Sequence, residues 1–182
     1  MRTFDELESL WNASQQPPRR NGTVRLIVLR KGDGVHETPA HADLSVEQGL
    51  HGDRWQKGGS PDPEAQVTMM NALAAELLTG GKLLDLPGDN LVVDLDLSKA
   101  ALPVGSRLQI GTAVLEVTAK PHTGCQKFSA RFGQDALRWV NWKSHRDRHL
   151  RGINCRIIEG GTVRVGDTCA VVGGADLNFT SL

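Results

Sequence analysis

Short apolar stretches separated by glycine-containing turns dominate the chain after residue 22. These stretches are rich in β-branched residues or alternate between apolar and polar positions, as β-strands do. We predict strands at residues 24–30, 91–96, 107–110, 113–118, 155–158, 162–165 and 169–172. Strands this short and closely spaced favour a mainly β (α+β) fold, a compact antiparallel barrel, over a parallel sheet with crossover helices.

Helical patterns interrupt the strands in only a few places. Thr3 and Glu6 fit the S/T-x-x-E capping box, and apolar residues follow on one helical face, so an N-terminal helix is predicted. Residues 67–78 are rich in Ala, Leu and Met, and residues 134–145 hold two tryptophans among polar residues. Both segments are predicted to be helices at the periphery of the barrel.

The chain divides into three parts by its composition. Residues 1–22 contain the predicted helix and a linker with two prolines and two arginines, residues 23–174 form the barrel domain, and residues 175–182 are a tail. There is no internal repeat and no low-complexity segment. A length of 182 residues is typical of one domain with a well-filled core.

Composition excludes several classes of protein. Basic and acidic residues balance at 21 each, so no global charge attracts nucleic acid or an anionic membrane. No apolar run approaches the roughly 20 residues of a membrane span, and the N-terminus lacks the pattern of a signal peptide. The chain has three cysteines, an odd number, and they lack the spacing typical of a disulfide-bonded domain. They therefore predict free thiols and a cytoplasmic location. Cys155 and Cys169 lie in predicted strands and are expected to be core residues.

Cys125 has the setting of a reactive thiol. It follows the alternating run at residues 113–118, within the sequence KPHTGCQKF at 120–128. A strand that ends in a turn broken by proline and glycine presents its next side chains at the rim of a sheet. The nearby cations Lys120, His122 and Lys127 favour the thiolate, which is the form that acts as nucleophile and soft-metal ligand.

Two glycine turns carry polar residues that suit ligand binding. The sequence GLHGDRW at 49–55 offers Asp53 as an acceptor and Arg54 as a planar donor. Asn90 stands at the start of a predicted strand in PGDNLVV at 87–93. Taken alone, an Asp–Arg pair that closes a turn and an Asn that bonds its own turn explain these residues better than ligand binding does.

The segment at residues 138–151 is strongly basic in an otherwise neutral chain. It contains five Arg or Lys residues besides two histidines, against one aspartate, which makes an anion site plausible although a solvated face is the commoner explanation. His145 and His149 have the spacing of helical metal ligands. They lack a third ligand and the glutamate of the HExxH motif, which argues against zinc.

In order and spacing, these segments resemble the MOSC domain, which ends the molybdenum-cofactor sulfurases and also occurs as free-standing bacterial proteins. The resemblance covers residues 24–172. The resemblance rests on six segments. They are GLHGDR at 49–54, QVT at 66–68, PGDNLVV at 87–93, VGSRLQIG at 104–111, residues 113–125, and the stretch from RG at 151–152 to EGGTVRVGD at 159–167. The acidic residue before the strand asparagine is Asp89 here, whereas the arginine usual upstream of it is absent.

The resemblance implies a compact β-barrel with a molybdenum cofactor (molybdopterin) site. Cys125 would be the metal ligand or would hold sulfur, roles that suit a soft thiolate. Cations would bind the phosphate of the cofactor, and Asn90 and His122 would form hydrogen bonds nearer the reacting centre. The residues implied in cofactor binding are Asp53, Arg54, Asn90, His122, Lys127, Arg131, Arg148 and Arg151.

Two functions follow from the resemblance. The first is an oxidoreductase component that reduces N-hydroxylated compounds and takes electrons from a separate reductase, because the chain has no flavin fingerprint and no iron–sulfur cysteine set. The second is a sulfur carrier that holds a persulfide on Cys125. The 182 residues include no pyridoxal-phosphate desulfurase domain of the sulfurase kind, so that carrier would need a separate sulfur donor protein.

Overall fold

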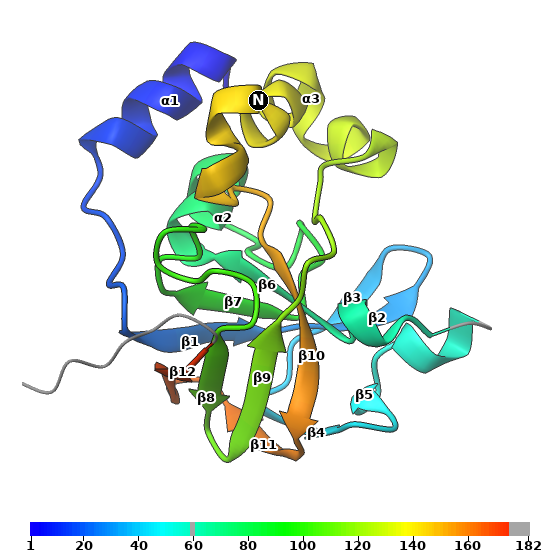
Figure 1. Ribbon diagram of the computed structural model, residues 1–182. Helices are drawn as coiled ribbons and strands as arrows, with labels where there is room; N and C mark the ends of the chain where they lie inside the picture. The colour runs from blue at the N-terminus through cyan, green and yellow to red at the C-terminus, as the bar shows by residue number, and fades with distance from the viewer. Residues whose placement is uncertain (59–60, 175–182) are drawn as a thin grey trace, which may run out of the picture.

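A closed barrel of seven strands lies at the centre of this computed structural model, which describes residues 1–58 and 61–174 (Figure 1). Neighbouring strands follow the order β1-β12-β8-β9-β10-β6-β7. All neighbouring pairs are antiparallel except the parallel pair β6–β7. The barrel strands are β1 (Asn21–Ile27), β6 (Val67–Asn71), β7 (Leu91–Asp94), β8 (Arg107–Ile110), β9 (Ala113–Val117), β10 (Ile153–Glu159) and β12 (Thr168–Gly173). The predicted mainly β barrel is confirmed.

Alternation of apolar and polar residues decides which side chains fill the barrel. In β9, Ala113, Leu115 and Val117 are buried while the residues between them are partly exposed. Cys155 and Cys169 are fully buried in the same core, as predicted. Every residue of β6 is buried, because one of its faces lines the barrel and the other is covered by helices.

Three α-helices pack together at one end of the barrel (Figure 1). They are α1 (Phe4–Ala13), α2 (Ala72–Thr79) and α3 (Gln126–Asn141). The capping box of Thr3 and Glu6 is present at the start of α1, as the sequence predicts. A second apolar core lies between these helices and the outer face of β6 and β7, with Trp139 of α3 fully buried in it.

Smaller elements extend from the barrel. The hairpin of β2 (Leu29–Gly32) and β3 (Val35–Glu37) follows β1 directly, and a three-stranded sheet has the order β11-β4-β5. Its strands are β4 (His41–Ser45), β5 (Gly49–Leu50) and β11 (Gly161–Arg164). Single 3₁₀ turns are η1 (Trp55–Gly58), η2 (Pro63–Ala65) and η3 (Lys143–Arg148).

Two helix predictions need correction. The segment 67–78 is a strand up to Asn71 and a helix only from Ala72, because Asn71 caps the helix by accepting a hydrogen bond from the Ala74 N–H. In α3 the backbone of Gly133 is non-helical, with φ of 88° and ψ of 170°, so two helical segments meet there. The helix predicted at residues 134–145 corresponds to the second segment, which ends at Asn141, whereas the first segment, residues 126–132, was not predicted. The predicted tail at 175–182 lies outside the described residues.

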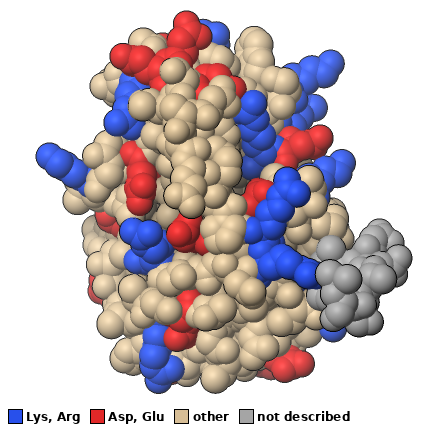
Figure 2. Space-filling view, turned by 90° about the vertical axis from the view of Figure 1, so that its left-hand side faces the viewer, with Lys and Arg blue, Asp and Glu red and all other residues tan. Residues whose placement is uncertain are grey.

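Charges of both signs are interspersed on the face that carries α1 and the N-terminal segment, which Figure 2 shows. This distribution agrees with the balanced composition. Among residues 1–58 and 61–174, no helix combines the length and the apolar character that a membrane span requires.

Candidate functional site

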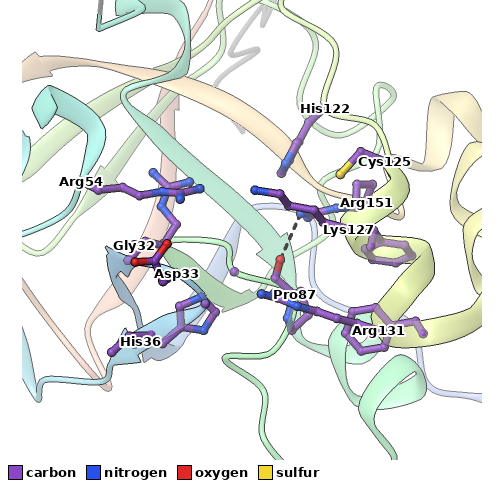
Figure 3. A pocket seen from close by; sticks show the side chains of 16 residues that line it. Gly32, Asp33, His36, Arg54, Pro87, His122, Cys125, Lys127, Arg131 and Arg151 are labelled. Carbon is purple, nitrogen blue, oxygen red and sulfur yellow. Dashed lines mark hydrogen bonds between the residues drawn. The ribbon is translucent and has the colours of Figure 1, made fainter. Parts of the chain in front are cut away.

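A cavity of about 440 Å³ lies between the β2–β3 hairpin and the first turns of α3 (Figure 3). Pro87 and Gly88, just before β7, form part of its wall, and Arg151, just before β10, forms another part. The lining is strongly cationic. It includes Arg30, Arg54, Lys127, Arg131 and Arg151, together with the thiol of Cys125.

Cys125 occupies the N-cap position of α3 and is exposed. The backbone N–H groups of Phe128 and then Lys127 lower the pKa of its thiol; burial opposes this and the Arg151 charge adds to it. No capping hydrogen bond of normal geometry forms, so the thiolate is stabilised by the aligned N–H dipoles at the start of the helix. Burial has the opposite effect on the core thiols, raising the pKa of Cys169 to about 12 and that of Cys155 further.

Asn141, at the end of α3, holds the turn that carries Cys125. Its Oδ1 accepts a hydrogen bond from the Gly124 N–H at 2.9 Å, and its Nδ2 donates to the Gly124 carbonyl at 3.1 Å. The first helical hydrogen bond then runs from the Ser129 N–H to the Cys125 carbonyl. Both ends of one helix therefore fix the position of the thiol.

A buried carboxylate, Asp89, organises the centre of the cavity wall. Arg151 donates from Nη1 to Asp89 Oδ2 and from Nη2 to the Pro87 carbonyl at 3.1 Å, and its guanidinium lies 5.3 Å from the centre of the Phe128 ring. His122 Nδ1 lies 3.4 Å from Asp89 Oδ1. Burial lowers the pKa of His122 to about 4 although Asp89 opposes the shift, so the imidazole is neutral at pH 7.

A second buried carboxylate, Asp53, fixes Arg30. Asp53 accepts hydrogen bonds from Arg30 Nε at 3.0 Å and Nη2 at 2.8 Å, from the Trp55 N–H, and from Asn90 Nδ2 at 3.1 Å. Burial would raise the pKa of Asp53, but Arg30 outweighs it and lowers that pKa. Asn90 is fully buried, and its Oδ1 accepts hydrogen bonds from Thr68.

The predicted cofactor-binding residues therefore separate into three groups. Those that line the cavity are Arg54, His122, Lys127, Arg131 and Arg151, with Cys125. Asp53 and Asn90 lie behind Arg30 and bond to protein atoms, so they act on the cavity through Arg30. Arg148 forms an ion pair with Glu8 of α1 at 2.9 Å and does not line the cavity.

Arg54 and Lys127 differ from Arg30 and Arg151 of the same cavity. Their side chains extend toward one another from opposite sides of it (Figure 3). Among the described residues, neither forms an ion pair, whereas Arg30 and Arg151 are paired with buried carboxylates. Unpaired cations beside an exposed thiol of lowered pKa suit a ligand that combines an anionic group with a soft, thiophilic centre.

Sequence reasoning missed several lining residues, above all Arg30 and His36. His36 comes from β3, and its Nδ1 lies 3.4 Å from Asp85 Oδ2. The signal for this hairpin was the sequence KGDG at 31–34, a glycine turn between β-branched stretches. Local patterns place Arg30 only at the end of a strand, and its pairing with Asp53, 23 residues further along the chain, depends on the fold.

Comparison with known proteins shows similar folds among solved structures. The YuaD protein of Bacillus subtilis superposes with a TM-score of 0.61 at 17% identity, over 82% of this chain and 94% of that one. YiiM from Escherichia coli gives 0.56 at 17% identity over 84% and 71%, and YiiM from Geobacillus stearothermophilus gives 0.59 at 15% over 84% and 75%. No curated protein sequence matches. The MOSC domain family matches residues 70–170, more than half of the chain, and the protein belongs to that family.

Proposed function

We propose that this protein binds a molybdenum cofactor in the 440 Å³ cavity through Cys125 and acts as an oxidoreductase component on N-hydroxylated compounds. One observation carries the proposal. The single exposed cysteine of the described chain has a lowered thiol pKa and stands in a cavity lined by five cations. Membership of the MOSC family adds the association with molybdenum.

The donor set fits such a group. Among the described residues, no cluster of three His, Cys, Asp or Glu side chains could hold a metal ion by itself. A molybdenum ion that arrives already bound to its pterin needs only one protein ligand, and a thiolate is the soft ligand such a centre favours. Arg54, Lys127 and Arg131 would bind the phosphate of the pterin through charge-assisted hydrogen bonds.

When bound, the cofactor would supply the electron chemistry, and the residues of this chain would provide orientation and electrostatics. Cys125 would hold the group at the start of α3. His122, neutral at pH 7, has one ring nitrogen free to accept a hydrogen bond and one to donate. Phe128 and Phe132 would exclude water from one side of the cavity. Electrons would come from a separate reductase.

Metal analysis of protein purified from a host that makes the cofactor tests this proposal. The wild-type chain should contain molybdenum in a ratio near one per chain, and Cys125→Ser should lose it. Cys169→Ala is the matched control, because that thiol is buried in the barrel core and its pKa is raised. Full molybdenum content in Cys125→Ser would overturn the assignment of the ligand.

A sulfur carrier is the second candidate, and the lowered thiol pKa of Cys125 favours it as well. Cys125 would then hold a persulfide received from a donor protein and would pass the sulfur on without turnover of its own. Intact-mass analysis separates the two functions. One extra sulfur atom confined to Cys125, without metal, supports carriage, and metal without the extra sulfur supports redox catalysis.

A further inference from the structure

A second cavity, of about 750 Å³, lies on the other side of the segment that leads to Cys125. Residues 118–123 of that segment line it, and so do residues 149–154 before and within β10. It shares His122 and Arg151 with the first cavity, but Cys125 is not among its lining residues. The two cavities are therefore neighbours with a common wall.

The second cavity is apolar over much of its surface. Val117, Leu150 and Ile153 are buried core residues that reach it, and Val104, 54% exposed, stands at its rim. Ala119 is an exposed small residue within the same lining. Its volume falls in the range of roughly 300–1,000 Å³ that is typical of pockets for small organic ligands.

Two cations of the second cavity have no ion pair among the described residues. They are Lys99 and Arg146, both exposed, with Asp147 as the one carboxylate in the lining. The other cations there are occupied, because Lys120 pairs with Asp62 and Arg151 pairs with Asp89. The lining therefore carries a net positive charge beside an apolar surface.

We propose that this second cavity binds a small organic anion with an apolar, preferably aromatic, body. The body packs against Val104, Val117 and Ile153, and the anionic group binds Arg146 and Lys99 through charge-assisted hydrogen bonds. A neutral molecule of the same shape leaves both cations unpaired, and a small inorganic anion leaves the apolar surface exposed to water. The site does not depend on the cofactor proposed for the first cavity.

The segment between the cavities gives the ligand a contact with the reactive turn. Asn154 donates from Nδ2 to the Lys120 carbonyl at 3.1 Å, and Asn141 holds Gly124. Both asparagines line the second cavity. A ligand there touches the residues that fix Lys120 to Gly124, so its binding is expected to alter the NMR signals of this segment up to Cys125.

An NMR titration of ¹⁵N-labelled, cofactor-free protein tests the inference with 2-naphthoate and its uncharged isostere 2-naphthamide. The naphthoate should shift the amide signals of residues 119–123 and 150–154, and should bind roughly ten times more tightly than the amide, as expected for one charge-assisted contact. Arg146→Gln should remove most of that difference. Ala119→Trp, at an exposed position, should occupy part of the cavity and weaken naphthoate binding.

Lys143→Gln is the matched control, because Lys143 is exposed on the same 3₁₀ turn as Arg146 but does not line the cavity. It should bind the naphthoate as the wild type does. Equal affinity for the naphthoate and the amide would overturn the proposal, as would unchanged naphthoate binding in Ala119→Trp. Because no cofactor is present in this experiment, its failure leaves the molybdenum proposal unaffected.

Discussion

Asn141 forms two hydrogen bonds with the backbone of Gly124, at 2.9 Å and 3.1 Å, across a helix that begins beside Gly124. This contact fixes the turn that places Cys125 at the N-cap of α3. Asn141→Ala should therefore lower the reactivity of Cys125 toward iodoacetamide at neutral pH by roughly two- to fivefold. That range corresponds to the stabilisation of about 0.3–1 kcal/mol that a helix N-terminus gives an anion.

The measurement is the alkylation rate against pH, with intact mass to count the labelled thiols. One thiol should react in the folded protein, since Cys155 and Cys169 are buried, and three should react after denaturation. Asn12→Ala, which removes an exposed asparagine bonded to Glu8, is the control and should not change the rate. An unchanged rate in Asn141→Ala would show that the turn holds its shape without this residue.

Asp89→Ala should destabilise the protein by about 3 kcal/mol, because it leaves the guanidinium of Arg151, whose side chain is only 11% exposed, without its carboxylate. Urea unfolding followed by circular dichroism measures the change. Glu37→Ala removes the partner of Lys31 in a more exposed pair and should have little effect. Similar stabilities for the two variants would mean that Arg151 finds another partner in the cavity.

Stability should depend on pH through His122. Its pKa is lowered from 6.5 to about 4 in the folded protein, so the unfolded chain binds more protons between these values. The free energy of unfolding should therefore fall as pH is lowered from about 6.5 to about 4, by about 3 kcal/mol at most, and should be unaffected by this residue above pH 7.

In His122→Gln the free energy of unfolding should change less with pH between about pH 5.5 and 6.5 than it does in the wild type. Carboxylates remain ionised in this range. Urea midpoints at several pH values give the comparison. His41→Gln, which replaces an exposed histidine in β4, should keep the wild-type slope. If the slope persists in His122→Gln, protonation of another group causes it.

Glu8 connects α1 to α3 and η3. It accepts hydrogen bonds from Trp139 Nε1 at 3.0 Å and from Arg148 Nη1 at 2.9 Å. Glu8→Ala should destabilise the protein by about 1–2 kcal/mol and should increase hydrogen exchange in α1 most of all. Glu47→Ala, an exposed glutamate in the turn before β5, is the control. Exchange in α1 that matches the wild type would mean that Leu7 and its apolar neighbours hold the helix without Glu8.

Local patterns were enough to predict much of the barrel. The bounds of β8, Arg107–Ile110, agree with the prediction, and β9 differs by one residue. The pattern failed at β6, because a strand buried on both faces has no alternation and its Met and Val residues read as part of the helix that follows. The helical segment of α3 before Gly133 was not predicted, because it is short and lies between the turn of Cys125 and the non-helical backbone of Gly133.

The parts of the candidate site that could be predicted are those whose residues lie close together in the sequence. Cys125 stood out because of its cationic neighbours, and Arg54, Lys127 and Arg151 proved to lie around it. Long-range pairing was not predictable. Nothing near Arg148 in the sequence indicates that Glu8 pairs with it, and nothing near Asn90 indicates that Val28, Thr68 and Asp53 bond its polar atoms. Such contacts depend on the packing of distant segments.

Four of the five cations that line the cavity of Cys125 divide into a rigid half and an adaptable half. Buried carboxylates hold Arg30 and Arg151 in place, so these two side chains lose little conformational freedom when a ligand arrives. Among the described residues Arg54 and Lys127 have no such carboxylate partner, so nothing comparable fixes their long side chains. We expect the rigid half to dictate how a ligand is oriented, while the adaptable half tolerates ligands of different length. One scaffold of this kind can serve several related compounds without any change to its core.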